Sequence, residues 1–298
     1  MHKGAHFQPS EPPLIVAESS LLYGRLKSLA TQQRMVFFAG LPGTGKSLLI
    51  HQLAHLAAAV ERQVHLLQWD VARPVFEAHP AARAYPMQNG VTHGVIRKAI
   101  GLWVRQAVNG WHRDHPDFHH LLIGETPFIG NRFIELAQIT GDEAEIQLAS
   151  ASCMFVIPVP SPQVRRFIEA ERVRRSDNPV HVREVEDAPP QVLHQLWLEL
   201  TQTAVYLGIK GAPTQPDAGY EPQIYQRVYE ALLRNRHTQV MPIDTILPSP
   251  QLSVYDFSIP HTELVPIPRE VEESIYTIDN RYSDAATLRR DLLQWYLV

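Results

Sequence analysis

A short glycine-rich segment limits the possible folds of this chain more than any other part of its sequence. The segment runs Gly40-Leu41-Pro42-Gly43-Thr44-Gly45-Lys46-Ser47 and matches the pattern G-x-x-x-x-G-K-[ST] in full. The apolar run before it, RMVFFAG at 34–40, is too short for a helix of ordinary length, and a helical pattern follows from Lys46 to about Arg62. The sequence therefore predicts a buried strand, a tight loop and a helix in direct succession.

This segment has the composition of a phosphate-binding loop. Its three glycines let the backbone turn its N–H groups inward, and the positive end of the following helix points to the same place. Lys46 would then place its charge on the β and γ phosphates of a nucleoside triphosphate, and the Ser47 hydroxyl would ligate Mg²⁺. The expected nucleotide-binding residues are Gly40, Pro42, Gly43, Thr44, Gly45, Lys46, Ser47 and Leu48.

Apolar stretches and helical patterns alternate along the rest of the chain. Further strands are predicted at 63–70, 119–125, 152–160 and 237–247. Helices are predicted at 18–31, 91–111, 130–139, 162–176, 190–207 and 221–236, and a last helix begins at its N-cap Ser283. This alternation indicates an α/β fold of three layers, in which helices cover both faces of a mostly parallel sheet. We expect a flexible arm at 1–17, one α/β domain at 18–247 and a C-terminal extension at 248–298 that packs on the core.

The charge and cysteine content exclude several classes of protein. With 27 basic and 31 acidic residues, the net charge is -4, which argues against a basic nucleic-acid surface and against an acidic disordered tail. The single cysteine, Cys153, excludes an internal disulfide and a thiolate metal cluster, as in a reducing cytoplasm. No apolar run approaches the roughly 18 residues that cross a bilayer, and the first residues lack a signal-peptide core. We therefore expect a soluble, cytoplasmic protein without a membrane partner.

Through this loop, and through the order of strands and helices over much of residues 1–180, the chain resembles the P-loop NTPase superfamily. The resemblance implies a nucleoside triphosphate and Mg²⁺ bound at a mostly parallel sheet. Motor and AAA-type ATPases end a second functional strand in Asp-Glu, whereas this chain has Gly124-Glu125. GTPases read guanine with Asn-Lys-x-Asp, and the nearest string, NRYSD at 280–284, departs from it in register. The chain is more similar to the nucleoside, nucleotide and small-molecule kinases.

Two strand ends carry the similarity to these kinases. Asp70 and Arg73 are similar to the Asp-x-x-Arg of polynucleotide and adenylylsulfate kinases, which implies Asp70 beside the acceptor hydroxyl and Arg73 on an acceptor phosphate or sulfate. Glu125, with Arg132 downstream, looks like the Glu-Arg-Ser and later Arg of deoxynucleoside kinases, although Thr126 replaces the first arginine. That likeness implies a base or Mg²⁺ ligand at Glu125. A turn cap at Asp70 and surface pairing of the two arginines remain the structural alternatives.

The arginine-dense segment RRFIEAERVRR at 165–175 resembles the mobile lid of such kinases. In the lid, arginines close over the transferring phosphoryl group and stabilise the charge of its loose transition state. The resemblance thus implies phosphate or substrate contacts for Arg165, Arg166 and Arg172. The alternative is a solvated helix face, because Arg165, Glu169 and Arg172 have the i, i+4, i+7 spacing of ordinary ion pairs.

Histidines gather before the third predicted strand. They are His112, His115, His119 and His120, and Asp114 and Asp117 lie among them. A metal site is one interpretation, but the stretch has no repeated ligand spacing and joins a helix end to a strand. We therefore expect a solvated loop.

Together these features predict an ATP- and Mg²⁺-dependent phosphotransferase with a small-molecule acceptor, a nucleoside or nucleotide being favoured. Two alternatives remain, a polynucleotide 5'-end kinase and a nucleotide-dependent ATPase switch or scaffold, and the acidic net charge disfavours a long nucleic-acid footprint. The expected catalytic residues are Lys46, Glu125, Asp70 and Arg172, the substrate-binding residues are Arg73, Arg132, Arg165 and Arg166, and the metal ligands are Ser47 and Glu125.

Overall fold

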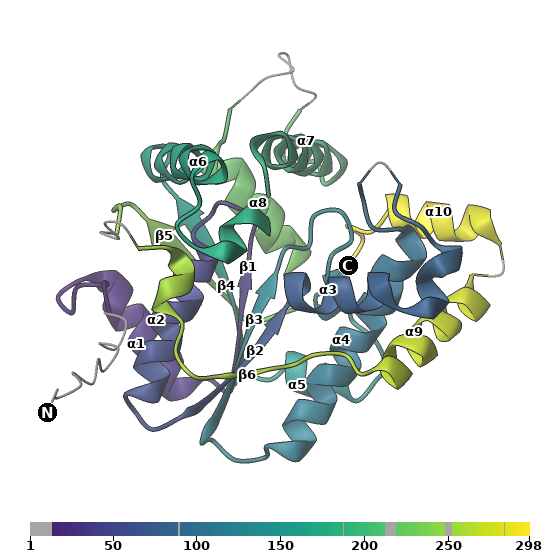
Figure 1. Ribbon diagram of the computed structural model, residues 1–298, viewed down its shortest axis with the longest axis horizontal. Helices are drawn as coiled ribbons and strands as arrows, with labels where there is room; N and C mark the ends of the chain where they lie inside the picture. Colours follow the sequence, from purple (N-terminus) through teal and green to yellow (C-terminus); the bar gives the residue numbers. More distant parts are fainter. Residues whose placement is uncertain (1–13, 89, 187, 212–218, 248–251, 283) are drawn as a thin grey trace, which may run out of the picture.

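Six strands form one sheet at the centre of the protein, in the order β5-β4-β1-β3-β2-β6 (Figure 1). The computed structural model describes residues 14–88, 90–186, 188–211, 219–247, 252–282 and 284–298. The strands are β1 (Met35–Ala39), β2 (Gln63–Gln68), β3 (His120–Thr126), β4 (Cys153–Pro160), β5 (Thr238–Ile243) and β6 (Thr262–Glu263). Every pairing within this sheet is parallel. The predicted three-layer α/β fold with a mostly parallel sheet is confirmed.

The sheet separates two apolar cores. All of β1 is buried, and its side chains alternate, with Met35 and Phe37 in one core and Val36 and Phe38 in the other. Helices α1 (Leu21–Gln32) and α2 (Lys46–Ala58) cover the face of Val36 and Phe38. The remaining helices are α3 (Trp69–Ala78), α4 (Gly94–Asp114), α5 (Ala144–Leu148), α6 (Pro162–Asp177), α7 (Pro190–Tyr206), α8 (Pro222–Leu232), α9 (Pro268–Arg281) and α10 (Ala285–Leu293).

The strand order explains where the glycine loop Gly40–Ser47 lies. The chain passes from β1 beyond β3 to β2 and then returns, so the first two crossovers run in opposite directions along the sheet. Because such crossovers are right-handed, opposite directions place their helices on opposite faces. Helix α2 therefore covers one face, and α3 and α4 contribute to the core on the other. The carboxyl ends of β1, β3 and β2 meet at the edge between these helices, which is where such sheets bind ligands.

Two predicted elements differ from the structure. The strand predicted at 63–70 ends at Gln68, and Asp70 lies in the first turn of α3 instead of at a strand end. Pro74 inside α3 conceals this helix in the sequence, since an interior proline removes a backbone hydrogen bond. The helix predicted at 130–139 is wrong. Asn131 and Phe133 have φ of 60° and 62°, which is incompatible with a right-handed helix, and only a 3₁₀ turn at Ile134–Leu136 forms.

Both ends of the described chain pack on the core. Of the predicted arm, residues 1–13 lie outside the described residues, whereas Val16 is buried and Ile15 and Val16 donate backbone hydrogen bonds to Gln52 of α2. At the other end, β6 pairs with β2, and α9 and α10 lie along the outer side of α4 (Figure 1). The predicted cap Ser283 lies outside the described residues, and Asp284 caps α10. Among the described residues, no helix has both the length and the apolar character that a membrane crossing requires.

Candidate functional site

Three positions of the glycine loop are ones at which a larger side chain would be strained or would clash. Gly43 and Gly45 have φ of 78° and 83°, in the left-handed region that glycine tolerates best. Gly40 is required for a different reason, because a Cβ there would stand 2.3 Å from the Tyr225 hydroxyl oxygen of α8. Its backbone N–H donates to the Thr126 carbonyl at 3.2 Å, which fixes the loop to the end of β3.

Lys46 lies at the start of α2 with its charge directed back into the loop. Its side chain is nearly fully buried, and Nζ donates to the Leu41 carbonyl at 2.8 Å and lies 3.1 Å from Glu125 Oε1. Burial lowers the pKa of Lys46, and the opposite charge of Glu125 counteracts part of this effect. Ser47 and Leu48, the other predicted residues of this turn, are half-buried on α2.

The two predicted carboxylates converge on this loop. Glu125 pairs in register with Phe38 of β1 on one side and with Gln68 of β2 on the other, so the sheet places it directly between the loop and α3. Asp70 is open to solvent, yet the surrounding protein raises its pKa, and Glu125 raises it further. Lys46 also acts on the Asp70 carboxylate, by lowering its pKa. Solvent therefore reaches the Asp70 carboxylate from one side while protein surrounds it on the others, as in a crevice.

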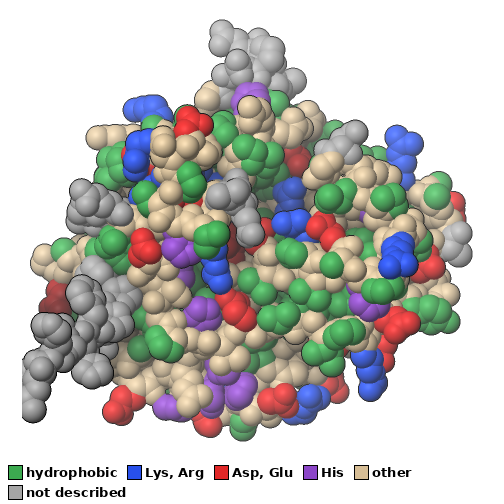
Figure 2. Space-filling view, viewed as in Figure 1, with side chains coloured by type: hydrophobic (Ala, Val, Ile, Leu, Met, Phe, Trp, Pro, Cys, Tyr) green, Lys and Arg blue, Asp and Glu red, His purple; other side chains and the backbone are tan. Residues whose placement is uncertain are grey.

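Figure 2 shows this side of the protein hollowed between the helices at the top of the view and α3. Lys and Arg side chains and Asp and Glu side chains face one another along the hollow. In Figure 1 the same place lies above the carboxyl ends of the central strands. The glycine loop, Glu125 and Asp70 lie at this end of the sheet, since Lys46 contacts Glu125 and both charges act on Asp70.

Arg132 follows β3 and lines the same crevice. Burial lowers its pKa, and the charges of Glu199 and Asp70 oppose that shift. Gly130, two residues earlier, lies close to both Arg132 and Glu199 of α7. A Cβ on Gly130 would stand 3.3 Å from Arg132 Nη1 and from the Glu199 carboxyl oxygens. Arg97 of α4 donates a hydrogen bond to the Gly130 carbonyl and brings a second guanidinium to this place.

Sequence reasoning did not find Glu199. Glu199 lies in the middle of an ordinary amphipathic helix, 67 positions after Arg132, so no local spacing connects the two residues. Burial raises the pKa of Glu199, and Arg132 and Arg97 lower it. A half-buried carboxylate between two arginines is visible only once the helix is in place.

Arg73 and Arg166 are less closely tied to the crevice. Arg73 forms an ion pair with Glu77 one turn later, at 2.7 Å, while its charge still lowers the pKa of Asp70. Arg166 is exposed on α6. The structure thus brings Arg73 close to Asp70 and leaves Arg166 on the outside of the helix.

Helix α6, the predicted lid, lies over the glycine loop. Arg165 is almost completely buried, and its Nη1 donates to the Pro42 carbonyl at 2.7 Å while its Nε donates to Glu169 at 2.6 Å. The guanidinium also stands over the Tyr220 ring, 5.5 Å from its centroid. The ion-pair spacing seen in the sequence is therefore real, with the Arg165 side chain buried and the Glu169 side chain 41% exposed. Arg165 connects α6 to the loop.

Arg172 lies two turns further along α6 and still acts on the loop. Its positive charge contributes to the lowered pKa of Lys46, so the two side chains are electrostatic neighbours. Its Nη1 lies 3.4 Å from the Ala188 carbonyl, a weak contact that leaves most of the guanidinium's donors for other partners. Arg172 is therefore an electrostatic neighbour of the loop, whereas Arg166 is exposed.

The histidine segment lies at the other end of the sheet and is only partly a solvated loop. His119 is exposed, as expected, but His115 and His120 are half-buried and pack against the buried His65 of β2. No local pattern connects His65 to this segment, because it lies 50 positions before His115. Parallel pairing of β2 with β3 brings these rings together.

The described site thus unites an amide-lined loop, a buried lysine, two carboxylates and several arginines in one crevice. Such a set can bind a polyphosphate, hold Mg²⁺ through carboxylate and hydroxyl oxygens, and accept a proton from a nearby hydroxyl. Comparison with protein-family models and with curated proteins finds no match to this chain.

Proposed function

We propose that this protein is an ATP- and Mg²⁺-dependent phosphotransferase that acts on a small-molecule acceptor, a nucleoside or nucleotide. The observation that carries the proposal is the contact of Lys46 with Glu125, at 3.1 Å, inside the glycine loop. A phosphate-binding lysine and an acidic side chain thereby occupy the place where donor phosphates, metal and acceptor must meet. We place the reaction in the cytoplasm, where a lone thiol such as Cys153 stays reduced.

Donor binding is assigned to the glycine loop. Lys46 Nζ contacts the Leu41 carbonyl and Glu125. Donor phosphates would take the place of these two partners, because a doubly charged phosphate group attracts the ammonium more strongly. The release of Lys46 would free Glu125 for Mg²⁺ or its water. Ser47, the next residue on α2, supplies the hydroxyl for the same ion.

Acceptor activation is assigned to the far wall of the crevice. The raised pKa of Asp70 brings its basicity closer to neutrality, which favours proton transfer from an acceptor hydroxyl. Glu125 is the second candidate, since it stands between Asp70 and the loop. Arg73 and Arg132 offer charge for an acceptor phosphate, and Glu199 can accept a hydrogen bond from a hydroxyl or amino group. The nucleoside or nucleotide is inferred from the resemblance to kinases with these motifs.

Closure is assigned to α6. Arg165 connects this helix to Pro42, and Arg172 on the same helix lies near Lys46. Guanidinium groups at this position stabilise the charge that spreads over the equatorial oxygens during transfer. Exclusion of water by the same helix would favour transfer to the acceptor over hydrolysis.

The proposal is tested with labelled ATP and Mg²⁺ against a panel of nucleosides, nucleotides and oligonucleotide 5' ends. We expect label on a nucleoside or nucleotide, no label with Lys46→Ala, and a fall of about 10²- to 10⁴-fold with Glu125→Gln or Asp70→Asn, whichever removes the base. Label only on oligonucleotides, or hydrolysis without transfer, would replace this function by one of its alternatives. Activity retained by Lys46→Ala would contradict the nucleotide site itself.

A further inference from the structure

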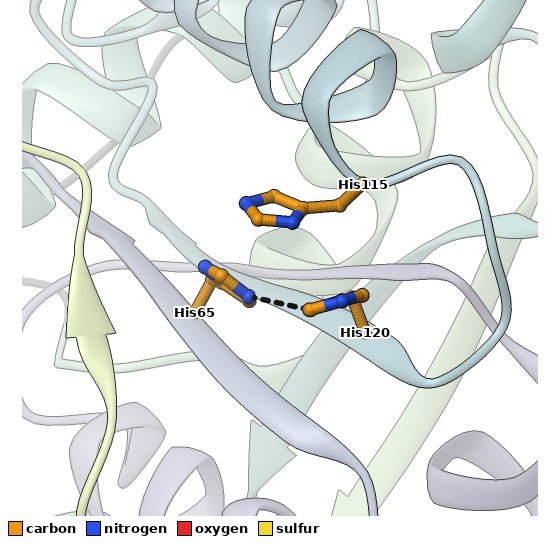
Figure 3. Close-up of side chains that lie close together, drawn as sticks. All are labelled: His65, His115 and His120. Carbon is orange, nitrogen blue, oxygen red and sulfur yellow. Dashed lines mark hydrogen bonds between the residues drawn. The ribbon is translucent and has the colours of Figure 1, made fainter.

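Three histidines from separate parts of the chain form a compact cluster at the amino end of β3. His65 lies within β2, His115 caps the C-terminus of α4, and His120 is the first residue of β3. One ring nitrogen from each lies within 4.8 Å of the other two. Figure 3 shows the three rings facing one another, with His65 Nε2 and His120 Nδ1 in a hydrogen bond of 3.0 Å. The His115 ring lies over both, at centroid distances of 4.4 and 4.3 Å.

These distances are close to those of a three-histidine metal centre. With Zn–N bonds of about 2.0–2.1 Å, two nitrogens of a tetrahedral zinc ion stand about 3.3 Å apart. The His65 and His120 nitrogens are at 3.0 Å and need only a small separation. From the 4.8 Å limit of the cluster, His115 must move inward by at most about 1.5 Å, which a half-exposed ring can do by rotation about its side-chain bonds.

The surroundings hold the ligands in place. The backbone carbonyls of His115 and His120 accept hydrogen bonds from the guanidinium groups of Arg34 and Arg62, the second at 2.7 Å. The positive charges of Arg34 and Arg62 repel a cation and so disfavour metal binding. The C-terminal end of the 21-residue helix α4, which His115 caps, and the carboxylate of Asp117, which raises the pKa of His120, act in the opposite direction.

We propose that His65, His115 and His120 bind one Zn²⁺ ion, or another late divalent ion that prefers nitrogen ligands. Three imidazoles leave a fourth position for water. The seven residues of β3 separate this place from the glycine loop, so the ion would lie about 20 Å from the nucleotide site and apart from the Mg²⁺ chemistry there. Such a centre would bind β2, β3 and the end of α4 to one another.

The test measures metal binding by the full-length, untagged chain after treatment with a chelator. Zn²⁺ is titrated in competition with a chromophoric chelator, and Co²⁺ is added separately to look for the visible bands of a tetrahedral ion. We expect one equivalent of Zn²⁺, tetrahedral Co²⁺ bands and no competition by Mg²⁺. Loss of one ligand in His115→Gln or His120→Gln should weaken Zn²⁺ binding by at least about 100-fold, since changes outside the ligand set alone cost 10–100-fold.

The matched control is His237→Gln, which alters an exposed histidine outside this cluster and should leave Zn²⁺ affinity unchanged. Thermal melting without metal checks that each variant folds like the wild type, and added Zn²⁺ should raise the melting temperature of the wild type and of His237→Gln only. Absence of Zn²⁺ binding by the wild type would overturn the proposal. So would equal loss of affinity in the control variant.

Discussion

Asp70 has opposite consequences for function and for stability. Desolvation by the surrounding protein and the nearby Glu125 raise the pKa of Asp70, so the folded protein binds this proton more tightly than the unfolded chain does. Ionisation of Asp70 therefore costs folding free energy as the pH rises above about 4, the ordinary aspartate value. We expect Asp70→Asn to raise the free energy of unfolding at pH 7, and the gain to shrink as the pH falls toward 4. Urea unfolding across this pH range measures it.

The same variant is expected to lose phosphoryl transfer by about 10²- to 10⁴-fold if Asp70 is the base. Asp114→Asn is the control, because this aspartate is exposed at the end of α4 and should change neither quantity. A destabilised Asp70→Asn protein at pH 7 would show that the carboxylate is held by partners that favour its charge, contrary to the shift in its pKa.

His51 of α2 makes the protein sensitive to acid. The residue is buried, and burial, with the charges of His261, His55 and Arg183, lowers its pKa from 6.5 to about 4. Between these values the unfolded chain binds a proton that the folded protein does not, so stability falls as the pH falls from 6.5 to 4. The full loss corresponds to about 3 kcal/mol.

We expect His51→Gln to flatten the dependence of unfolding free energy on pH in this window, whatever its effect at pH 7. Chemical denaturation at several pH values between 4 and 7 is the measurement. The exposed His119→Gln should keep the wild-type slope. An unchanged slope in His51→Gln would mean that another group causes the acid sensitivity.

Individual residues differ in how far the sequence could predict them. The place of Lys46 at the start of α2 was predictable, because a strand, a glycine-rich loop and a helical pattern follow one another directly in the sequence. Arg165 was predicted to bind substrate, and in the structure its guanidinium contacts Pro42, Glu169 and the Tyr220 ring. These contacts depend on how closely α6 packs on the loop, which no local sequence pattern encodes. Glu199 and His65 had no signal, since their partners are distant in sequence.

At the level of elements, the close contact of β1 with β3 explains why a glycine stands at position 124 of β3. A Cβ on Gly124 would stand 2.2 Å from Phe37 Cδ1 and 2.6 Å from Cε1 in the paired strand. Because that ring is fully buried, it has little room to move. We expect Gly124→Ala to destabilise the protein by about 1–3 kcal/mol, as other overpacked cores do.

Gly110→Ala provides a matched control for that prediction, as measured by urea unfolding. Gly110 lies within α4, and the nearest atom to an added Cβ is Arg113 Nη2 at 4.0 Å. Alanine has the higher helix propensity, so this variant should be more stable by about 0.5–1 kcal/mol. Equal effects at both positions would contradict the steric explanation for Gly124.

Elements with a regular apolar period were predictable, and those with local exceptions were not. Strands β1, β3 and β4 and helices α4, α6 and α7 follow the predicted ranges within a few residues. Helix α3 was missed because Pro74 lies inside it, and the helix predicted at 130–139 fails where Asn131 and Phe133 adopt positive φ. The packing of the whole chain imposes the helix around the interior proline of α3 and the positive φ angles at 131 and 133. The propensities of single residues therefore do not predict them.

At the scale of the whole molecule, the segment after residue 252 belongs to the same core as the sheet. Leu264 donates a backbone hydrogen bond to Leu66 of β2 at 2.8 Å, and Trp103 of α4 donates to Glu270 of α9 at 3.0 Å. Asp291 of α10 lies 3.1 Å from Lys98. These contacts predict one cooperative unfolding transition for the sheet and the C-terminal helices.

Trp295 provides the sharpest test of that cooperativity. Its ring is buried in the core that α4 and α9 share, so Trp295→Ala should lower the free energy of unfolding by about 3–5 kcal/mol in the single main transition. Leu293→Ala, at a side chain that is 64% exposed, should change it by less than about 0.5 kcal/mol. Denaturation followed both by far-UV circular dichroism and by tryptophan fluorescence would separate the two cases. If the C-terminal helices formed an independent module, Trp295→Ala would produce an early partial transition and leave the unfolding of the sheet unchanged.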